Sequence, residues 1–203
     1  MPNKLGIFGG SFDPIHLGHL LLAELCRETL GLNTVKFVVA NVSPLKTDRT
    51  MTSNRDRIEM VQLAIGGNPH FEMDTREIDR GGVSYSIDTA RSIAEELPDN
   101  NLYLLMGSDV LIDIAKWRTP RELFQIVTPA VITRAGFGEP NWALIDEFVD
   151  QDQLAEIKNA TVAVPQLEIS STDLKSRIRL GRSIRYQVPA AVETYIREHQ
   201  LYR

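Results

Sequence analysis

The chain has 203 residues, 43% of them hydrophobic and 24% charged, and a formal net charge of −5, which suits one soluble domain with a full hydrophobic core. The acidic balance argues against broad nucleic-acid binding, which needs a basic face, and no apolar run is long enough to span a membrane. The single cysteine, Cys26, excludes an internal disulfide, so we expect a cytoplasmic protein with Cys26 in its core.

Short apolar runs of strand type alternate with helical patterns along the chain. Strands are predicted over residues 5–8, 35–40, 71–74, 101–106, 126–133 and 161–164, and helices over 17–30, 52–65, 86–96, 171–180 and 189–199. Gly31 takes the usual glycine position after the first helix, and Pro129 leaves the start of the fifth strand open. Residues 136–152 are acidic and weakly patterned, and we interpret them as a loop-plus-helix excursion.

This alternation predicts an α/β fold, a Rossmann-like doubly wound parallel sheet with helices on both faces. Ligands bind such sheets at the carboxyl ends of the strands, near the point where the strand order reverses. Two glycine-containing turns, Gly9–Ser11 and Gly107–Asp109, each follow a predicted strand and should both lie at that edge. We expect a single domain over residues 1–203, with C-terminal helices from about residue 171 packed on it.

The first twenty residues contain an anion-binding pattern. Gly9 and Gly10 allow backbone N–H groups to approach a ligand closely. His16 and His19 share one face at the start of a helix, whose unpaired N–H groups favour an anion, and Gly18 leaves room between them. The alternative is that the two histidines only cap the helix or fill the core. The glycines that precede them favour a phosphate site.

Two segments resemble the HIGH-type nucleotidyltransferase superfamily. Residues 10–19, Gly-Ser-Phe-Asp-Pro-Ile-His-Leu-Gly-His, resemble its first motif, in which two histidines face the triphosphate and stabilise the reacting α-phosphate. Residues 169–177, Ile-Ser-Ser-Thr-Asp-Leu-Lys-Ser-Arg, resemble its second phosphate element, although alone they would usually be only a helix cap. The resemblance assigns the arginine of this element to Arg177 and leaves Lys175 as a weaker candidate.

Further segments narrow the resemblance to the nicotinate mononucleotide adenylyltransferases. Gly107–Asp109 matches a Gly-x-Asp turn of that family, and residues 82–89 and 43–46 resemble its Ser-Tyr-Thr-x-Asp-Thr and Pro-x-Lys segments. Trp117 stands where the family packs a tryptophan on the pyridine ring. Arg118 follows it, where many relatives carry an aromatic residue or histidine.

The resemblance implies a role for each matching position. The catalytic groups are His16, His19, Lys46 and Arg177. The implied ATP site consists of Gly9, Gly10, Ser11, Phe12, His16, His19, Gly107, Arg134, Ser170, Ser171, Thr172 and Arg177. The implied mononucleotide site consists of Lys46, Arg57, Ser84, Tyr85, Thr89, Asp109 and Trp117.

The implied reaction transfers AMP from ATP to nicotinate mononucleotide, giving deamido-NAD and pyrophosphate. Mg²⁺ is expected to bridge the substrate phosphates without a cluster of protein ligands. ATP and the mononucleotide are the expected partners, and the sequence does not decide between a monomer and a homo-oligomer. Two alternatives stay open: the same reaction with nicotinamide mononucleotide, and a nucleotide sensor without turnover.

Overall fold

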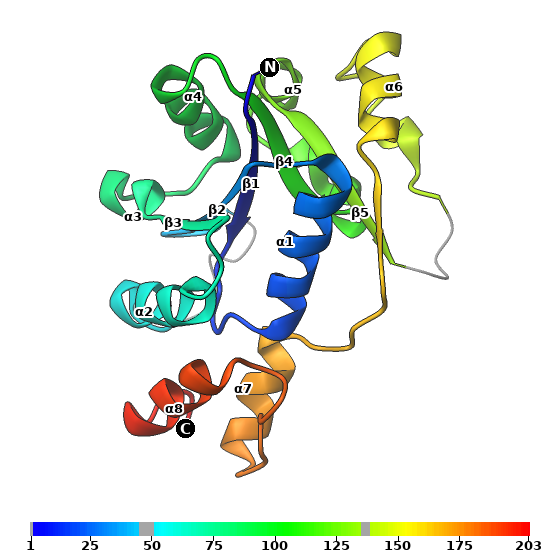
Figure 1. The fold of residues 1–203 in the computed structure, drawn as a ribbon. Coiled ribbons are helices and arrows are strands. Elements are labelled where there is room, and N and C mark those ends of the chain that lie inside the picture. The colour runs from blue at the N-terminus through cyan, green and yellow to red at the C-terminus, as the bar shows by residue number, and fades with distance from the viewer. Residues whose placement is uncertain (1, 45–50, 135–138) are drawn as a thin grey trace.

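A computed structural model describes residues 2–44, 51–134 and 139–203. Within these residues, six parallel strands form one sheet in the order β3-β2-β1-β4-β5-β6 (Figure 1). The strands are β1 (Lys4–Gly10), β2 (Thr34–Val39), β3 (Phe71–Asp74), β4 (Asn101–Gly107), β5 (Thr128–Arg134) and β6 (Val162–Val164). The predicted parallel sheet is therefore confirmed.

Helices connect these strands and close the chain. They are α1 (Leu17–Leu30), α2 (Asn54–Ile65), α3 (Arg76–Arg80), α4 (Ser86–Glu96), α5 (Pro120–Ile126), α6 (Gln151–Asn159), α7 (Ser171–Arg179) and α8 (Ala190–Glu198), with 3-10 helices η1 (Ser108–Lys116) and η2 (Trp142–Leu144). Gly31 ends α1 in the left-handed conformation (φ 64°, ψ 42°), as its sequence position predicts. None of the described helices is long and apolar enough to cross a membrane.

Each face of the sheet has its own hydrophobic core. On one face, helices α1, α2, α7 and α8 pack on the strands through fully buried residues that include Cys26, Met60, Leu174 and Val192. On the other face, α4, η1, α5 and α6 contribute Ile93, Leu111, Leu123 and Ile157. Strand side chains alternate between these cores, because successive residues of a strand point to opposite faces. Helices on both faces confirm the doubly wound architecture, and the core position of Cys26 is also confirmed; burial raises the pKa of its thiol to about 12.

The strand order places a ligand-binding edge beside β1. The neighbours of β1 are β2 on one side and β4 on the other, so the chain reverses its direction of progress across the sheet at this point. The carboxyl ends of β1 and β4 carry the turns at Gly9–Ser11 and Gly107–Asp109. Both turns thus lie at the switch point of the sheet, where α/β proteins bind ligands.

The start of β5 differs from the prediction. Residues up to Ile126 belong to α5, and the strand begins at Thr128. Pro129 pairs with Leu104 of β4, whereas β6 reaches only residues 132–134. Pro129 therefore has a strand on one side only, which explains how a residue without an N–H is tolerated inside the sheet.

The predicted loop-plus-helix excursion over residues 136–152 has most of its helix beyond the predicted end. Among the described residues of that segment, η2 is a single short turn, and α6 begins at Gln151. Asp150 caps α6: the Gln153 N–H donates to Asp150 Oδ1 (2.8 Å) and the Asp150 N–H donates to Gln153 Oε1 (3.0 Å). An Asp followed three residues later by Gln is a capping-box signal that could have located this helix.

Candidate active site

A cavity of about 570 Å³ opens at the carboxyl ends of β1 and β4, a volume that is typical of small-molecule sites. The end of β1, the end of β4, the start of α4 and the end of η1 supply its wall. The predicted site residues that line it are Gly9, Gly10, Ser11, Ser84, Tyr85, Gly107 and Trp117. The fold therefore brings together three of the seven residues of the predicted mononucleotide site and four of the twelve of the predicted ATP site.

Gly9 turns bare backbone toward open space in this cavity. A Cβ added at Gly9 would meet no heavy atom within 4 Å. In the same strand, a Cβ at Gly6 would come within 2.8 Å of Leu32 Cδ1 and 2.9 Å of Leu105 Cδ1. Neither packing nor a positive φ requires glycine at position 9, so the empty space beside it fits the close approach of a ligand.

His16 and His19 stack on one another at the start of α1. Their ring centroids are 3.6 Å apart with an angle of 24° between the planes, and the His16 N–H donates to His19 Nδ1 (3.2 Å). Because Nδ1 accepts, the proton of the neutral His19 ring lies on Nε2, which is then a donor. A Cβ at Gly18 would come within 3.0 Å of His16 Nδ1, so glycine lets the His16 ring lie against the backbone.

His16 is a nearly enclosed histidine. It is 7% exposed, and burial lowers its pKa to about 4, so the ring is neutral at pH 7. Its Nδ1 has no hydrogen-bond partner among the residues that the structure describes. A neutral imidazole offers one N–H to a phosphate oxygen, which agrees with charge stabilisation by hydrogen bonding rather than by a fixed positive charge.

The first N–H groups of α1 are more occupied than predicted. Leu17 donates its N–H to Gln187 O (2.9 Å), and His19 donates to His16 O (2.9 Å). Phe12, a predicted ATP residue, has its side chain in the core at 2% exposure, where its ring meets that of His19 at 5.2 Å. Neither histidine belongs to the cavity wall. The anion-binding capacity at this turn thus rests on the imidazoles more than on the helix N-terminus.

The second predicted phosphate element, residues 169–177, lies beside the histidine turn, and several of its side chains form hydrogen bonds with other groups of the protein. Ser170 caps α7 by accepting from the Asp173 N–H (3.0 Å), and the Ser171 hydroxyl donates to Pro14 O (2.9 Å). Arg177 donates from Nε and Nη2 to Ser183 O (3.0 and 2.9 Å). Thr172 is exposed. A phosphate role for Arg177 requires its guanidinium to leave Ser183.

The start of α4 is tied to neighbouring loops on the cavity wall. Ser84 accepts at Oγ from the Asn41 N–H (2.9 Å), while the Ser84 N–H donates to Val42 O (2.8 Å). The Arg118 guanidinium lies over the Tyr85 ring at 5.0 Å and contacts Asp88 Oδ2 at 3.3 Å. Arg118 lines the cavity, and only its position next to Trp117 could have indicated this from sequence.

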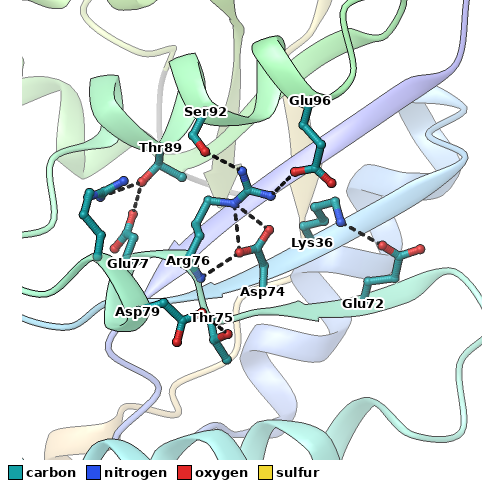
Figure 2. A network of polar contacts seen from close by, with 11 residues as sticks. Lys36, Glu72, Asp74, Thr75, Arg76, Glu77, Asp79, Thr89, Ser92 and Glu96 are labelled. Carbon is teal, nitrogen blue, oxygen red and sulfur yellow. Dashed lines mark hydrogen bonds and ion pairs between the residues drawn. The ribbon is translucent and has the colours of Figure 1, made fainter.

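Thr89, predicted in the mononucleotide site, instead anchors α4. It is 2% exposed, and its hydroxyl donates to Glu77 Oε1 (2.5 Å) and accepts from Arg80 Nη2 (3.3 Å). Figure 2 shows this contact within a larger polar network between β3, α3 and α4. Glu77 itself lines the cavity, so Thr89 contacts the site through that carboxylate and not directly.

Arg57 holds the backbone of two segments that line the cavity. It is fully buried, and its Nη1 donates to Ser11 O (2.8 Å) and Ala40 O (2.7 Å) while burial lowers its pKa. The guanidinium therefore holds the backbone after β1 and after β2 and is not part of the cavity wall.

Asp109 is a further predicted residue that does not line the cavity. Its side chain is exposed, and a Cβ at Gly107 would require the Asp109 carboxylate to shift. Arg134 ends β5, but its side chain and all of Lys46 lie outside the described residues.

Comparison with known proteins gives a consistent result. Residues 7–177 match the family described as cytidylyltransferase-like. Nicotinate-nucleotide adenylyltransferases are similar over nearly the full length: that of Rhodopirellula baltica is 40% identical over 98% of this chain and 93% of its own, and that of Thermus thermophilus is 38% identical over 98% and 100%. The structure of Plasmodium falciparum nicotinic acid mononucleotide adenylyltransferase complexed with NaAD has the same fold (TM-score 0.75, 19% identity, 98% of this chain and 97% of that chain).

Proposed function

Because the chain belongs to the nicotinate-nucleotide adenylyltransferases of the cytidylyltransferase-like family, we propose that it transfers AMP from ATP to nicotinate mononucleotide, giving deamido-NAD and pyrophosphate. One juxtaposition carries the proposal. A cavity with an indole and bare glycine backbone opens at the end of β1, and a stacked pair of histidines follows the same strand. The cavity suits a mononucleotide, and the histidines suit a reacting phosphate.

The chemistry requires charge stabilisation rather than proton removal. An oxygen of the mononucleotide phosphate, already an anion at pH 7, forms a bond to the α-phosphorus of ATP. The α–β bridging P–O bond breaks, and pyrophosphate leaves with that oxygen. His16 and His19 donate hydrogen bonds to the α-phosphate as charge develops on it, and catalysis consists of positioning and electrostatics.

Other groups would hold the leaving pyrophosphate. We assign this role to Lys46, Arg177 and the hydroxyls of residues 170–172, with Arg177 moving from Ser183. Within the described ranges, no three His, Cys, Asp or Glu side chains are placed to hold a metal ion, and Glu77 in the cavity wall already accepts from Thr89. We expect Mg²⁺ to be carried on the substrate phosphates, where it would neutralise their charge.

The test is a comparison of two mononucleotides with the purified protein. Supplied with ATP, nicotinate mononucleotide should release pyrophosphate and yield deamido-NAD by mass spectrometry. Its kcat/KM should exceed that of nicotinamide mononucleotide by more than about tenfold, because donors at the start of α4 favour a carboxylate. No pyrophosphate with either substrate would contradict catalysis and favour a sensor. Equal use of both would mean that the carboxylate is not recognised.

Trp117 tests the orientation of the substrates in the cavity. Trp117→Ala should raise KM for the mononucleotide about tenfold and leave KM for ATP nearly unchanged, because the indole would stack on the pyridine ring. Trp142→Ala is the matched control, since Trp142 does not line the cavity. A selective loss of ATP affinity in Trp117→Ala would place the indole beside the adenosine instead.

A further inference from the structure

The C-terminal segment of the chain reaches the turn that precedes His16. Asp13 is 4% exposed; its Oδ2 accepts from Lys175 Nζ (2.9 Å) and its Oδ1 accepts from the Tyr202 hydroxyl (2.7 Å). These partners are separated from Asp13 by 162 and 189 positions in the sequence. In Figure 1, α7 and α8 lie at the end of the molecule where α1 begins.

Two more contacts from the same segment hold the residues on either side of His16. Ahead of it, Pro14 O accepts from the Ser171 hydroxyl (2.9 Å). Behind it, Leu17 donates its N–H to Gln187 O (2.9 Å). The chain is therefore fixed by residues 171–202 at positions 13, 14 and 17, which bracket His16.

The Asp13 contacts are electrostatically strong. Burial alone would raise the pKa of Asp13, but hydrogen bonds from Lys175, Tyr202 and Thr52 outweigh it and hold the pKa below its usual value. Burial and the Asp13 charge raise the pKa of Tyr202, so its hydroxyl stays protonated and remains a donor. Lys175 Nζ also lies 5.7 Å from the Tyr202 ring centre.

Tyr202 adopts an uncommon backbone conformation while it makes this contact. Its φ is 65°, in the left-handed region that non-glycine residues rarely occupy. Such conformations persist where surrounding contacts determine them. The partly buried hydrogen bond to Asp13 is a contact of that kind, so the end of the chain is held in one place.

The geometry of the histidine pair depends on this turn. The His16 N–H reaches His19 Nδ1 (3.2 Å) only because His16 is extended, with φ −146° and ψ 170°. That bond fixes which nitrogen of His19 carries the proton, and hence which atom can donate to a phosphate. The backbone on both sides of His16 is what the C-terminal segment holds.

We propose that Tyr202 and Lys175 are positioning residues for His16 and His19, acting through Asp13. In this arrangement the last residues of the chain brace the histidine turn against the reacting phosphate. The consequence for turnover rests on the proposed function, whereas the consequence for the imidazole positions does not. Neither Tyr202 nor Lys175 contacts substrate in this role.

Tyr202→Phe removes the hydroxyl and keeps the ring. We expect kcat to fall about tenfold or more, with KM for both substrates within about twofold, because misplacing a catalytic group slows the chemical step more than binding. Tyr195→Phe is the matched control: its hydroxyl donates to Asp56 Oδ1 (2.9 Å) and joins α8 to α2, whereas that of Tyr202 donates to Asp13. It should retain wild-type kcat. Lys175→Met, the second variant, should lower kcat in the same way as Tyr202→Phe.

The kinetic outcomes separate positioning from general stabilisation. Thermal unfolding of each variant shows how much stability it loses. A Tyr202→Phe enzyme with normal kcat would overturn the proposal. Equal loss of kcat in Tyr195→Phe would overturn it too, because the effect would then follow stability and not the turn.

A spectroscopic measurement needs no turnover. The chain has four histidines, so their imidazole C–H resonances can be assigned individually by NMR. Tyr202→Phe should shift or broaden the resonances of His16 and His19 and leave exposed His70 unchanged. Unchanged His16 and His19 resonances would overturn the proposed positioning role of Tyr202. Absence of adenylyl transfer in the wild type would overturn the proposed function and leave this result standing.

Discussion

At the scale of single residues, the site combines groups whose chemistry is set by what covers them. His16 is the clearest case, because burial lowers the pKa of its ring and keeps it neutral. Its Nδ1 has no hydrogen-bond partner among the described residues. Gly9 is the opposite case, a residue in β1 whose missing side chain leaves open space. Each leads to a measurable expectation.

His16 should make stability depend on pH. Its pKa is about 4 in the folded protein, against about 6.5 when unfolded, so the unfolded chain binds more protons between these values. Stability is fully present above about pH 6.5 and is lost as the pH falls toward 4. When the pH is lowered from 7.5 to 4.5, the free energy of unfolding measured in urea should fall by about 2–3 kcal/mol less for His16→Gln than for the wild type.

His70→Gln is the control for this comparison, since His70 is exposed. Its stability should follow the wild-type pH profile. Parallel profiles for the wild type and His16→Gln would show that the His16 ring is solvated in solution.

Gly9→Ala should separate binding from stability. Since a Cβ at position 9 meets nothing within 4 Å, the free energy of unfolding should change by less than about 1 kcal/mol. The added methyl would occupy ligand space, so KM for ATP should rise about tenfold.

Gly6→Ala, in the same strand, should behave in the reverse way. Its methyl would press on Leu32 and Leu105, which costs about 1–3 kcal/mol, and KM for ATP should be unchanged. A strongly destabilised Gly9→Ala protein would contradict the open geometry at position 9.

At the scale of secondary-structure elements, polar side chains join α4 to β3 and α3. Arg76 connects β3 to α4: its Nε contacts both oxygens of Asp74 (2.9 and 2.8 Å), Nη1 donates to Ser92 Oγ (2.9 Å) and Nη2 to Glu96 Oε2 (2.8 Å) (Figure 2). Asp74 is only 7% exposed. This network holds α4 in position relative to β3, and the first residues of α4 line the cavity.

Arg76→Met should therefore lower both stability and substrate affinity. It removes the guanidinium from buried Asp74 and leaves the backbone N–H of residue 76 as a donor, which costs about 2–4 kcal/mol. The loosened α4 should raise KM for the mononucleotide more than KM for ATP. Glu72→Gln removes a more exposed pair with Lys36 in the same region and should cost less than about 1 kcal/mol. Chemical unfolding and kinetics of both variants measure this difference, and similar costs would contradict it.

At the scale of the whole molecule, the C-terminal helices share a core with α1, α2 and one face of the sheet. Leu174 of α7 and Val192 of α8 are fully buried in the same core as Cys26 and Met60. Both tryptophans pack on the opposite face, against the core formed by α4, η1, α5 and α6. Tryptophan fluorescence therefore reports on the face opposite α7 and α8, whereas far-UV circular dichroism reports on the helices of both faces.

If residues 1–203 fold as one domain, Leu174→Ala should lower the unfolding midpoint seen by both reporters. The cavity costs about 2–5 kcal/mol. Tryptophan fluorescence and far-UV circular dichroism should shift together, because a single cooperative unit unfolds in one transition. A fluorescence transition that stays in place while circular dichroism shifts would show that α7 and α8 form a separate unit.

Local signals in the sequence determined the fold and the family. Some signals depend only on residues that are near one another in the sequence. They are the alternating strand and helix patterns, Gly31 after α1 and the two glycine turns, and they predicted the doubly wound sheet and the cavity edge correctly. The short helices α3 and α5 and the 3-10 helix η1 were missed because they span five, seven and nine residues, fewer than the window of about 11–18 residues over which helical periodicity is recognised.

Only the tertiary structure decided which polar groups face the cavity and which hold the chain together. Arg57 and Thr89 were both predicted to bind the mononucleotide. In the structure both are buried: Arg57 donates to backbone carbonyls, and Thr89 donates to Glu77. Lys175 and Tyr202 meet Asp13 from the far end of the chain. Such pairings depend on how the elements pack in three dimensions, and no short-range pattern in the sequence encodes them.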